Sequence, residues 1–263
     1  MSDDAQMFRQ TTWTSTSTTE IDPATLDWDD IHLCLLPLTQ PPSVLDDLAT
    51  TLTVDEHERA SRFRFDRDRH RFIVARGLLR RLLSRYAGAS PDALRFAYGA
   101  FGKPYLETGA NQEKVAFSLS HSGDWALVGL TRGREIGVDL EQVRPMADYL
   151  DLSESNFAPA ETEALLRLPE DQHIDGFFAC WTRKEAYIKA LGLGLSLDLA
   201  TFVVSVEPRE SVEIIPATPR ADAHHVWGMR PLRDFWAAVA IAAPNAPAVF
   251  PKISRVSHST LAT

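Results

Sequence analysis

The sequence predicts an α+β (α/β) fold built as a pseudo-twofold pair of similar α/β subdomains, with a functional cleft between them. The chain has 263 residues, which is enough for two modest units that each bury a core. Both halves show a short helix signal, then a long helix, then short β-prone segments. An offset of 106 residues aligns four identical pairs: Phe72 with Phe178, Gly88 with Gly194, Asp92 with Asp198, and Phe96 with Phe202.

The first unit is expected over residues 28–132. An apolar run at 31–36 predicts a strand, and Thr53 with Glu56 forms a capping box that predicts a short helix towards Phe63. Apolar side chains at helical spacing predict a long helix over 68–86, ended by Gly88. Turn residues at 122–124 predict a hairpin between strands at 115–119 and 125–130.

The second unit is expected over residues 133–243 and repeats this order. It begins with a strand at 136–141, followed by a short helix at 159–168 and a long helix at 176–191. A strand is expected at 202–206, and a last hairpin at 226–229 and 235–241. The repeated order places the functional cleft between the two units.

Both ends of the chain are expected to lie outside these units. Residues 1–27 are rich in Ser, Thr and Asp and predict a mobile N-terminal tail, while three prolines predict a loose C-terminal tail over 244–263. The N-terminus lacks a signal-peptide pattern, and no apolar run approaches the roughly 18 residues of a membrane span. The two cysteines have no metal-ligand spacing. A cytoplasmic protein without membrane association is therefore expected.

Charge is unevenly distributed along the chain. The formal net charge of −9 argues against a general nucleic-acid-binding protein. Between Arg59 and Arg85, however, ten arginines stand against two aspartates. This segment is either a site for a discrete anionic ligand or a solvated arginine-rich helix face.

Asp139 and Glu141 lie in the segment Gly137-Val138-Asp139-Leu140-Glu141. Residues two apart on a strand share a face, so the two carboxylates point the same way. Such a pair suits Mg²⁺, which prefers oxygen ligands together with substrate phosphates. The alternative is the polar face of an edge strand.

Trp181, Glu185 and Lys189 share one face of the predicted long helix at a spacing of four residues. Glu185 is a candidate third carboxylate of the metal site, and Lys184 and Lys189 are candidate phosphate contacts. A surface ion pair between Glu185 and Lys189 is the alternative.

Two loops carry further residues that could donate hydrogen bonds to a phosphate. Ser120 and His121 lie at the predicted hairpin turn, where they either bind phosphate or form a capping turn. A hydrolase triad is disfavoured, because no Gly-x-Ser-x-Gly elbow is present. Gly102 permits close backbone approach to a ligand, and Pro104 fixes the direction of the loop that carries Lys103. Three carboxylates, several cations and one histidine suit Mg²⁺-assisted attack on a pyrophosphate.

Taken together, these motifs resemble the Sfp-type 4'-phosphopantetheinyl transferases. The resemblance covers about residues 53–206 and rests on four motifs in the order of that family: Gly102-Lys103-Pro104, Ser120-His121-Ser122, Gly137-Val138-Asp139-Leu140-Glu141, and Trp181-x-x-Lys184-Glu185-Ala186-x-x-Lys189-Ala190 followed by Gly192 and Gly194. Many relatives have Asn where this chain has Ser118, which affects only a neighbouring contact.

The resemblance implies a role for each matching residue. Asp139, Glu141 and Glu185 would bind Mg²⁺, and the catalytic residues would be Glu185, Lys189 and His121. The residues implied to bind coenzyme A are Arg59, Arg62, Arg76, Lys103, Pro104, Ser120, His121, Lys184 and Lys189.

The implied activity is transfer of 4'-phosphopantetheine from coenzyme A to a serine of an apo acyl or peptidyl carrier protein, with release of 3',5'-ADP. The resemblance leaves open whether the carrier belongs to fatty-acid, polyketide or nonribosomal peptide synthesis. A monomer is expected, since the cleft forms within one chain. Two alternatives stay open: a Mg²⁺-dependent phosphodiesterase, and a non-catalytic relative that binds coenzyme A or carrier proteins.

Overall fold

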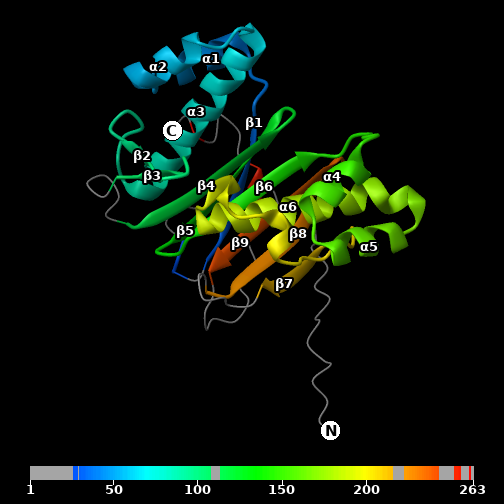
Figure 1. The fold of residues 1–263 in the computed structure, drawn as a ribbon. Coiled ribbons are helices and arrows are strands. Elements are labelled where there is room, and N and C mark those ends of the chain that lie inside the picture. The colour runs from blue at the N-terminus through cyan, green and yellow to red at the C-terminus, as the bar shows by residue number, and fades with distance from the viewer. Residues whose placement is uncertain are drawn as a thin grey trace.

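A computed structural model describes residues 26–28, 30–107, 113–215, 222–242, 252–255 and 261 (Figure 1). Two units follow one another along the chain, as the repeated element order predicts. The elements of the first unit are β1 (His32–Pro37), α1 (Pro42–Ala49), α2 (Val54–Ser61), α3 (Asp66–Ala87), β2 (Phe96–Tyr98), β3 (Pro104–Leu106), β4 (Val115–Ser122) and β5 (Trp125–Arg132).

The second unit contains β6 (Ile136–Gln142), α4 (Tyr149–Asn156), α5 (Pro159–Arg167), α6 (His173–Leu191), β7 (Ser211–Ile215), β8 (His224–Leu232) and β9 (Phe235–Ala242). Short 3₁₀ turns precede and follow α6 at Glu170–Gln172, Gly194–Ser196 and Leu199–Thr201. A last strand, β10 (Lys252–Arg255), lies further along the chain.

The two main sheets share a core of three strands and carry their fourth strand at opposite edges of that core. Their strand orders are β10-β1-β5-β4 and β6-β9-β8-β7, and a small ribbon pairs β2 with β3. In each unit the first strand pairs antiparallel with the second strand of the later hairpin. β1, β4 and β5 therefore correspond to β6, β8 and β9, which confirms the predicted pseudo-twofold pair of α/β units.

The long helices α3 and α6 also correspond. Each ends at a glycine in the left-handed conformation, Gly88 with φ 67° and Gly192 with φ 66°. The sequence alignment by 106 residues paired Gly88 with Gly194 instead. That pairing was wrong by two positions, because the glycine that ends α6 is Gly192.

Three other expectations also differ from the structure. Residues 202–206 form no strand, and the edge of the second sheet is β7 at 211–215. Within the expected C-terminal tail, β10 pairs parallel with β1. The sequence reading also missed α1, α4 and the β2–β3 ribbon. Most residues of the expected N-terminal tail lie outside the described part of the chain.

Three apolar clusters hold the molecule together. One lies between α3 and the first sheet, and a second lies between α6 and the second sheet. The third joins the two sheets, with Leu33 of β1, Val138 of β6 and Trp227 of β8 among its buried members. Figure 1 shows α1–α3 as one layer at the upper left and α6 lying across β6, β9 and β8.

Serine side chains join the sheets where β4 lies beside β6. Ser118 Oγ accepts a hydrogen bond from the Val138 amide at 3.1 Å, and Ser122 Oγ accepts one from the Gln142 amide at 3.0 Å. These short side chains stand where a backbone ladder would run in a continuous sheet. We call this contact between β4 and β6 the serine seam.

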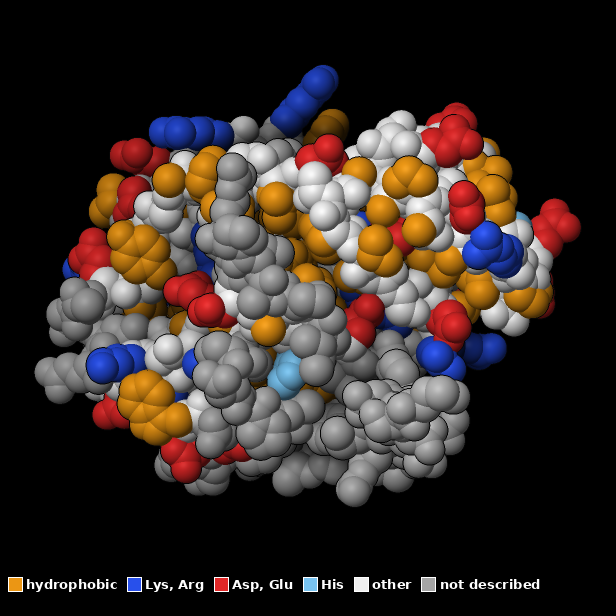
Figure 2. Space-filling view, turned by 60° about the horizontal axis from the view of Figure 1, so that its bottom comes forward, with side chains coloured by type: hydrophobic (Ala, Val, Ile, Leu, Met, Phe, Trp, Pro, Cys, Tyr) orange, Lys and Arg blue, Asp and Glu red, His pale blue; other side chains and the backbone are white. Residues whose placement is uncertain are grey.

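One face of the molecule shows described residues of both charges. On the face shown in Figure 2, acidic and basic side chains are interspersed, without a large field of one sign. Within the part of the chain that the structure describes, no helix combines the length and the apolar character needed to cross a membrane.

Candidate active site

Most of the predicted site residues of β4, β6 and α6 meet along the serine seam: Ser120, Asp139, Glu141, Glu185 and Lys189. Gly137 makes this possible, because a Cβ there would lie 2.0 Å from the Ala186 carbonyl oxygen and 2.2 Å from the Ala190 amide nitrogen. α6 therefore packs directly on the backbone of β6. The glycine before Val138-Asp139 is thus required by packing, and it brings Glu185 and Lys189 to the carboxylates of β6.

Asp139 is the centre of this arrangement. Its Oδ1 accepts hydrogen bonds from Ser120 Oγ at 2.8 Å and from Lys189 Nζ at 2.6 Å, and Lys189 Nζ also lies 3.1 Å from Ser120 Oγ. Asp139 is buried, and its Oδ2 has no hydrogen-bond partner among the described residues. A buried carboxylate oxygen without a partner is costly, so this atom suits an added cation or donor.

Glu141 and Glu185 flank the same charge. Burial raises the pKa of Glu141, the charge of Asp139 raises it further, and the hydrogen bond from Ser122 Oγ at 2.9 Å opposes the rise. Burial and the charge of Asp139 likewise raise the pKa of Glu185, against the attraction of Lys189. Asp139 therefore repels both glutamates, and further positive charge would relieve that repulsion.

The side chains as placed do not yet form a coordination sphere. No three His, Cys, Asp or Glu side chains within the described ranges approach closely enough to hold a metal. The donor set nevertheless fits Mg²⁺, because it offers carboxylate oxygens only, one of them buried and without a partner. Lys189 currently supplies the positive charge beside Asp139.

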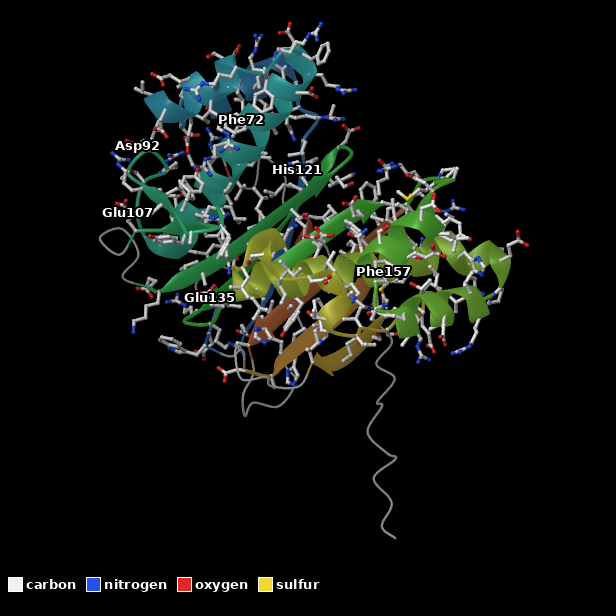
Figure 3. The ribbon with its side chains drawn as sticks, viewed as in Figure 1. Phe72, Asp92, Glu107, His121, Glu135 and Phe157 are labelled. Carbon is white, nitrogen blue, oxygen red and sulfur yellow. The ribbon has the colours of Figure 1, made fainter. Side chains whose placement is uncertain are left out.

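His121 and Lys103 lie at opposite ends of the seam. His121 is exposed near the β4–β5 turn, and the side chain that Lys103 contacts, Glu135, precedes β6 at the other end (Figure 3). Lys103 Nζ donates to Glu135 Oε2 at 2.5 Å and to the Ala190 carbonyl at 3.3 Å. Pro104 begins β3, directly after the Lys103 loop. At about 3.3 Å per residue, the two ends are roughly 20 Å apart, so only an elongated ligand could contact both.

Lys184 does not face the carboxylates, which corrects the expectation of a phosphate contact. Its side chain is fully buried, and Nζ lies 2.7 Å from each of Glu161 Oε2, the Leu199 carbonyl and the Phe202 carbonyl. It also lies 5.9 Å from the ring centroid of Phe157, which Figure 3 places on the side of α4, away from His121. All three ammonium protons thus have partners, and none remains for a ligand.

Arg76 is also committed to partners within the protein. It pairs with the buried Glu56 and stacks on Phe96, with its guanidinium carbon 3.9 Å from the ring centroid. Arg59 is exposed and lies over the ring of Phe72 at 5.4 Å, and Arg62 is exposed at the end of α2. Of the three arginines, Arg59 and Arg62 are therefore the more available to a ligand.

The sequence reading missed two features of the site. Ser122 was expected as a turn residue, whereas it is the last residue of β4 and binds both Glu141 and the backbone of β6. The signal was present, because Ser118, Ser120 and Ser122 alternate along a strand and must share one face. The ion pair of Glu161 with Lys184 was harder to predict, because the sequence pattern of a capping-box glutamate is the same with or without a lysine partner.

Comparison with known proteins identifies the class. Residues 135–240 match the 4'-phosphopantetheinyl transferase superfamily, and residues 41–131 match the N-terminal region of 4'-phosphopantetheinyl transferases. The chain belongs to this family and is an enzyme of the Sfp type, which confirms the resemblance drawn from the motifs.

Individual relatives carry the same name. The chain is 42% identical over 190 residues to the 4'-phosphopantetheinyl transferase HetI of Nostoc sp. strain PCC 7120, covering 72% of this chain and 80% of the relative. It is 33% identical over 180 residues to the 4'-phosphopantetheinyl transferase ffp of Bacillus subtilis, covering 68% and 77%. It is 30% identical over 163 residues to the transferase Sfp of Bacillus subtilis strain 168, covering 62% and 70%.

Proposed function

We propose that this enzyme transfers the 4'-phosphopantetheine arm of coenzyme A to a serine of an apo acyl or peptidyl carrier protein, releases 3',5'-ADP, and requires Mg²⁺. The observation that carries the proposal is the buried Asp139, which has one oxygen without a partner among the described residues and whose charge acts on both Glu141 and Glu185. Phosphoryl transfer needs this kind of site, because its transition state gathers negative charge on the transferred group.

Mg²⁺ would be held by Asp139, Glu141 and Glu185, and when bound it neutralises charge on the pyrophosphate. Lys189 is half-buried on the same seam and already donates to a carboxylate and a hydroxyl, so it can donate to a phosphate oxygen instead. Ser120 and His121 would hold further phosphate oxygens. The span of roughly 20 Å from Lys103 to His121 supports an elongated substrate such as coenzyme A.

Glu185 is our candidate for the group that accepts the proton of the carrier serine. Its raised pKa makes it a better base than an ordinary glutamate, and α6 holds it against the seam. Lys184 is not part of this proposal, because its ammonium is saturated by protein acceptors. Arg59 and Arg62 are proposed to contact the nucleotide phosphates.

We also propose that the enzyme acts as a monomer in the cytoplasm. β4, β6 and α6 come from one chain, so the site needs no second copy. Cys34 and Cys180 are both free and buried, which suits a reducing compartment.

The test is intact-mass spectrometry of an apo carrier protein after incubation with the enzyme, coenzyme A and Mg²⁺. We expect a gain of one phosphopantetheine, and we expect no gain when EDTA replaces Mg²⁺. No gain with acyl and peptidyl carriers, using protein shown to be folded, would contradict the proposal. Cleavage of coenzyme A without a carrier would instead support a phosphodiesterase.

A further inference from the structure

The corner between α2 and α3 carries a concentrated positive charge, and only Arg59 and Arg62 of it are used in the site proposed above. Six arginines and two aspartates lie within residues 59–71, on a chain whose formal net charge is −9. Asp66 pairs with Arg69 at 3.0 Å, and Asp68 pairs with Arg67 at 3.3 Å. We call residues 62–69 the basic corner.

Part of this charge is uncompensated. Among the described residues, no carboxylate forms an ion pair with Arg62 or Arg64, and both side chains are exposed. The guanidinium of Arg64 lies 5.4 Å from the ring centroid of Phe65. A local excess of positive charge therefore remains at the surface.

Two phenylalanines lie exposed among these arginines. Phe63 is 38% exposed and Phe65 is 59% exposed, although both are large apolar side chains. Phe63 contacts Phe72 of α3 at 5.4 Å between ring centroids, so the folded helix fixes its position. Exposed aromatic side chains beside arginines are typical of protein interfaces, where both residue types are enriched.

The basic corner adjoins the end of the seam where His121 lies. Arg71, in the first turns of α3, forms an ion pair with Asp124 in the turn between β4 and β5. The same turn follows Ser122, whose hydroxyl binds Glu141. A partner bound at the corner would therefore lie beside the carboxylates.

We propose that the basic corner is the docking surface for the carrier protein, which would present an acidic face to Arg64, Arg67 and Arg69 and an apolar contact to Phe65. This inference rests on the proposed function. A formal net charge of −9 gives the enzyme as a whole a net repulsion for an acidic partner. A basic region beside the site both attracts such a partner and sets its orientation.

The test compares two charge-reversal variants in steady-state transfer to an acidic apo acyl carrier protein. The test variant is Arg64→Glu with Arg67→Glu. The matched control is Arg167→Glu with Arg209→Glu, which reverses two exposed arginines of the second unit. Arg67 and Arg167 are each 74% exposed, and each pairs with a nearby carboxylate. Thermal unfolding of both variants checks that they stay folded.

We expect the test variant to raise the KM for the carrier about tenfold, and the KM for coenzyme A to stay within about twofold of wild type. Added salt should weaken transfer by the wild type and the control more than transfer by the test variant, because screening acts on the charges that the test variant removes. Phe65→Ala, which leaves the charge intact, should also raise the KM for the carrier while keeping the salt dependence.

Three results would overturn this docking surface. One is a carrier KM in the test variant that matches the control. Another is a rise in the KM for coenzyme A, and not in the KM for the carrier, in the test variant; this result would assign the corner to the nucleotide. The third is the absence of transfer by the wild type to any carrier. Only this third result would also overturn the proposed function.

Discussion

The two units solve the same packing problem with different chemistry. In the first unit, Glu56 closes the capping box of α2 by accepting from the Thr53 amide, and it also binds Arg76 and Arg80 of the long helix α3. In the second unit, Glu161 accepts from the Ala158 amide at the start of α5. It also binds Lys184 of the long helix α6.

The correspondence extends to sequence position. Arg80 and Lys184 lie eight residues before Gly88 and Gly192, the glycines that end α3 and α6. Both cations are almost completely buried, and both also donate to backbone carbonyls of a following loop. Lys184 is therefore the counterpart of a structural arginine, which explains why it does not face the seam.

The units differ at the neighbouring positions. On α6, Glu185 and Lys189 face a strand that a glycine allows the helix to touch. The close approach of α3 is to α1 instead, because a Cβ at Gly77 would lie 2.8 Å from Leu48 Cβ. One copy of the duplicated unit thus brings a helix onto the carboxylates, while the other supports an arginine-rich surface beside them.

The largest expected effect tests the special role of the second unit. Glu185→Ala should lower the transfer rate by roughly 10³-fold, because it removes both a candidate metal ligand and the candidate base. The fold should persist, since the pKa of this half-buried carboxyl is raised by partial burial and by Asp139, which marks its charge as unfavourable in the folded state. Rates come from the intact-mass assay, and circular dichroism monitors folding. Full activity in Glu185→Ala would remove both assigned roles.

A smaller effect tests the equivalence of the two buried ion pairs. Lys184→Met and Arg80→Met should each reduce the free energy of unfolding by about 3 kcal/mol, because each leaves a buried carboxylate without its cation. Denaturant unfolding measures this loss. The exposed pair offers a control, and Arg167→Met should cost less than about 1 kcal/mol.

The KM for coenzyme A distinguishes a structural role of Lys184 from a role in binding phosphate. The folded fraction of Lys184→Met should retain a KM for coenzyme A within about twofold of wild type, because the lysine contacts protein acceptors only. A tenfold or greater rise in that KM, with stability unchanged, would restore Lys184 to the phosphate site.

The smallest expected effect is the pH dependence of stability, which has opposite signs for Glu56 in the first unit and Glu141 in the second. Burial acts to raise the pKa of Glu56, but hydrogen bonds from Arg80, Arg76 and Thr53 and the charge of Arg76 lower it below 4.5 overall. Its stabilising contribution is therefore present at neutral pH and is lost as the pH falls below about 4.5 towards the folded-state pKa.

Glu141 should behave in the opposite way. Burial and Asp139 raise its pKa above 4.5, so its favourable contribution is complete below that pH and is lost as the pH rises through the folded-state pKa. In EDTA at pH 7, Glu141→Gln should therefore raise the melting temperature slightly, and Glu56→Gln should lower it. The two differences from wild type should both shrink towards pH 4. A lower melting temperature in Glu141→Gln at pH 7 would contradict the repulsion inferred at the seam.

Local signals in the sequence predicted much of this fold. The capping box at Thr53 and Glu56, the apolar stripe of α3 and the hairpin turn at 122–124 each depend on neighbouring residues, and all three formed as expected. The strand expected at 202–206 failed because its apolar residues serve a different purpose. Val204 and Val206 pack into the second core from an irregular segment that Lys184 and Glu161 hold in place.

The sequence predicted which residue types form the site, but only partly the direction in which each side chain points. Strand alternation placed Asp139 and Glu141 together, and helical spacing placed Glu185 with Lys189. The opposite direction of Lys184 depends on where α5 packs, which is a long-range property. The pairing of Arg76 with Glu56, twenty residues away, likewise needed the arrangement of α2 against α3.

The pairing of β10 with β1 has a consequence for the order in which the protein is made. β1 is buried along nearly its whole length, and its outer backbone edge is covered by residues 252–255, which a ribosome adds only after both units. Until then the nascent chain presents an apolar strand with an open edge, the feature that recruits other strands. The first unit to leave the ribosome is thus the last to be completed.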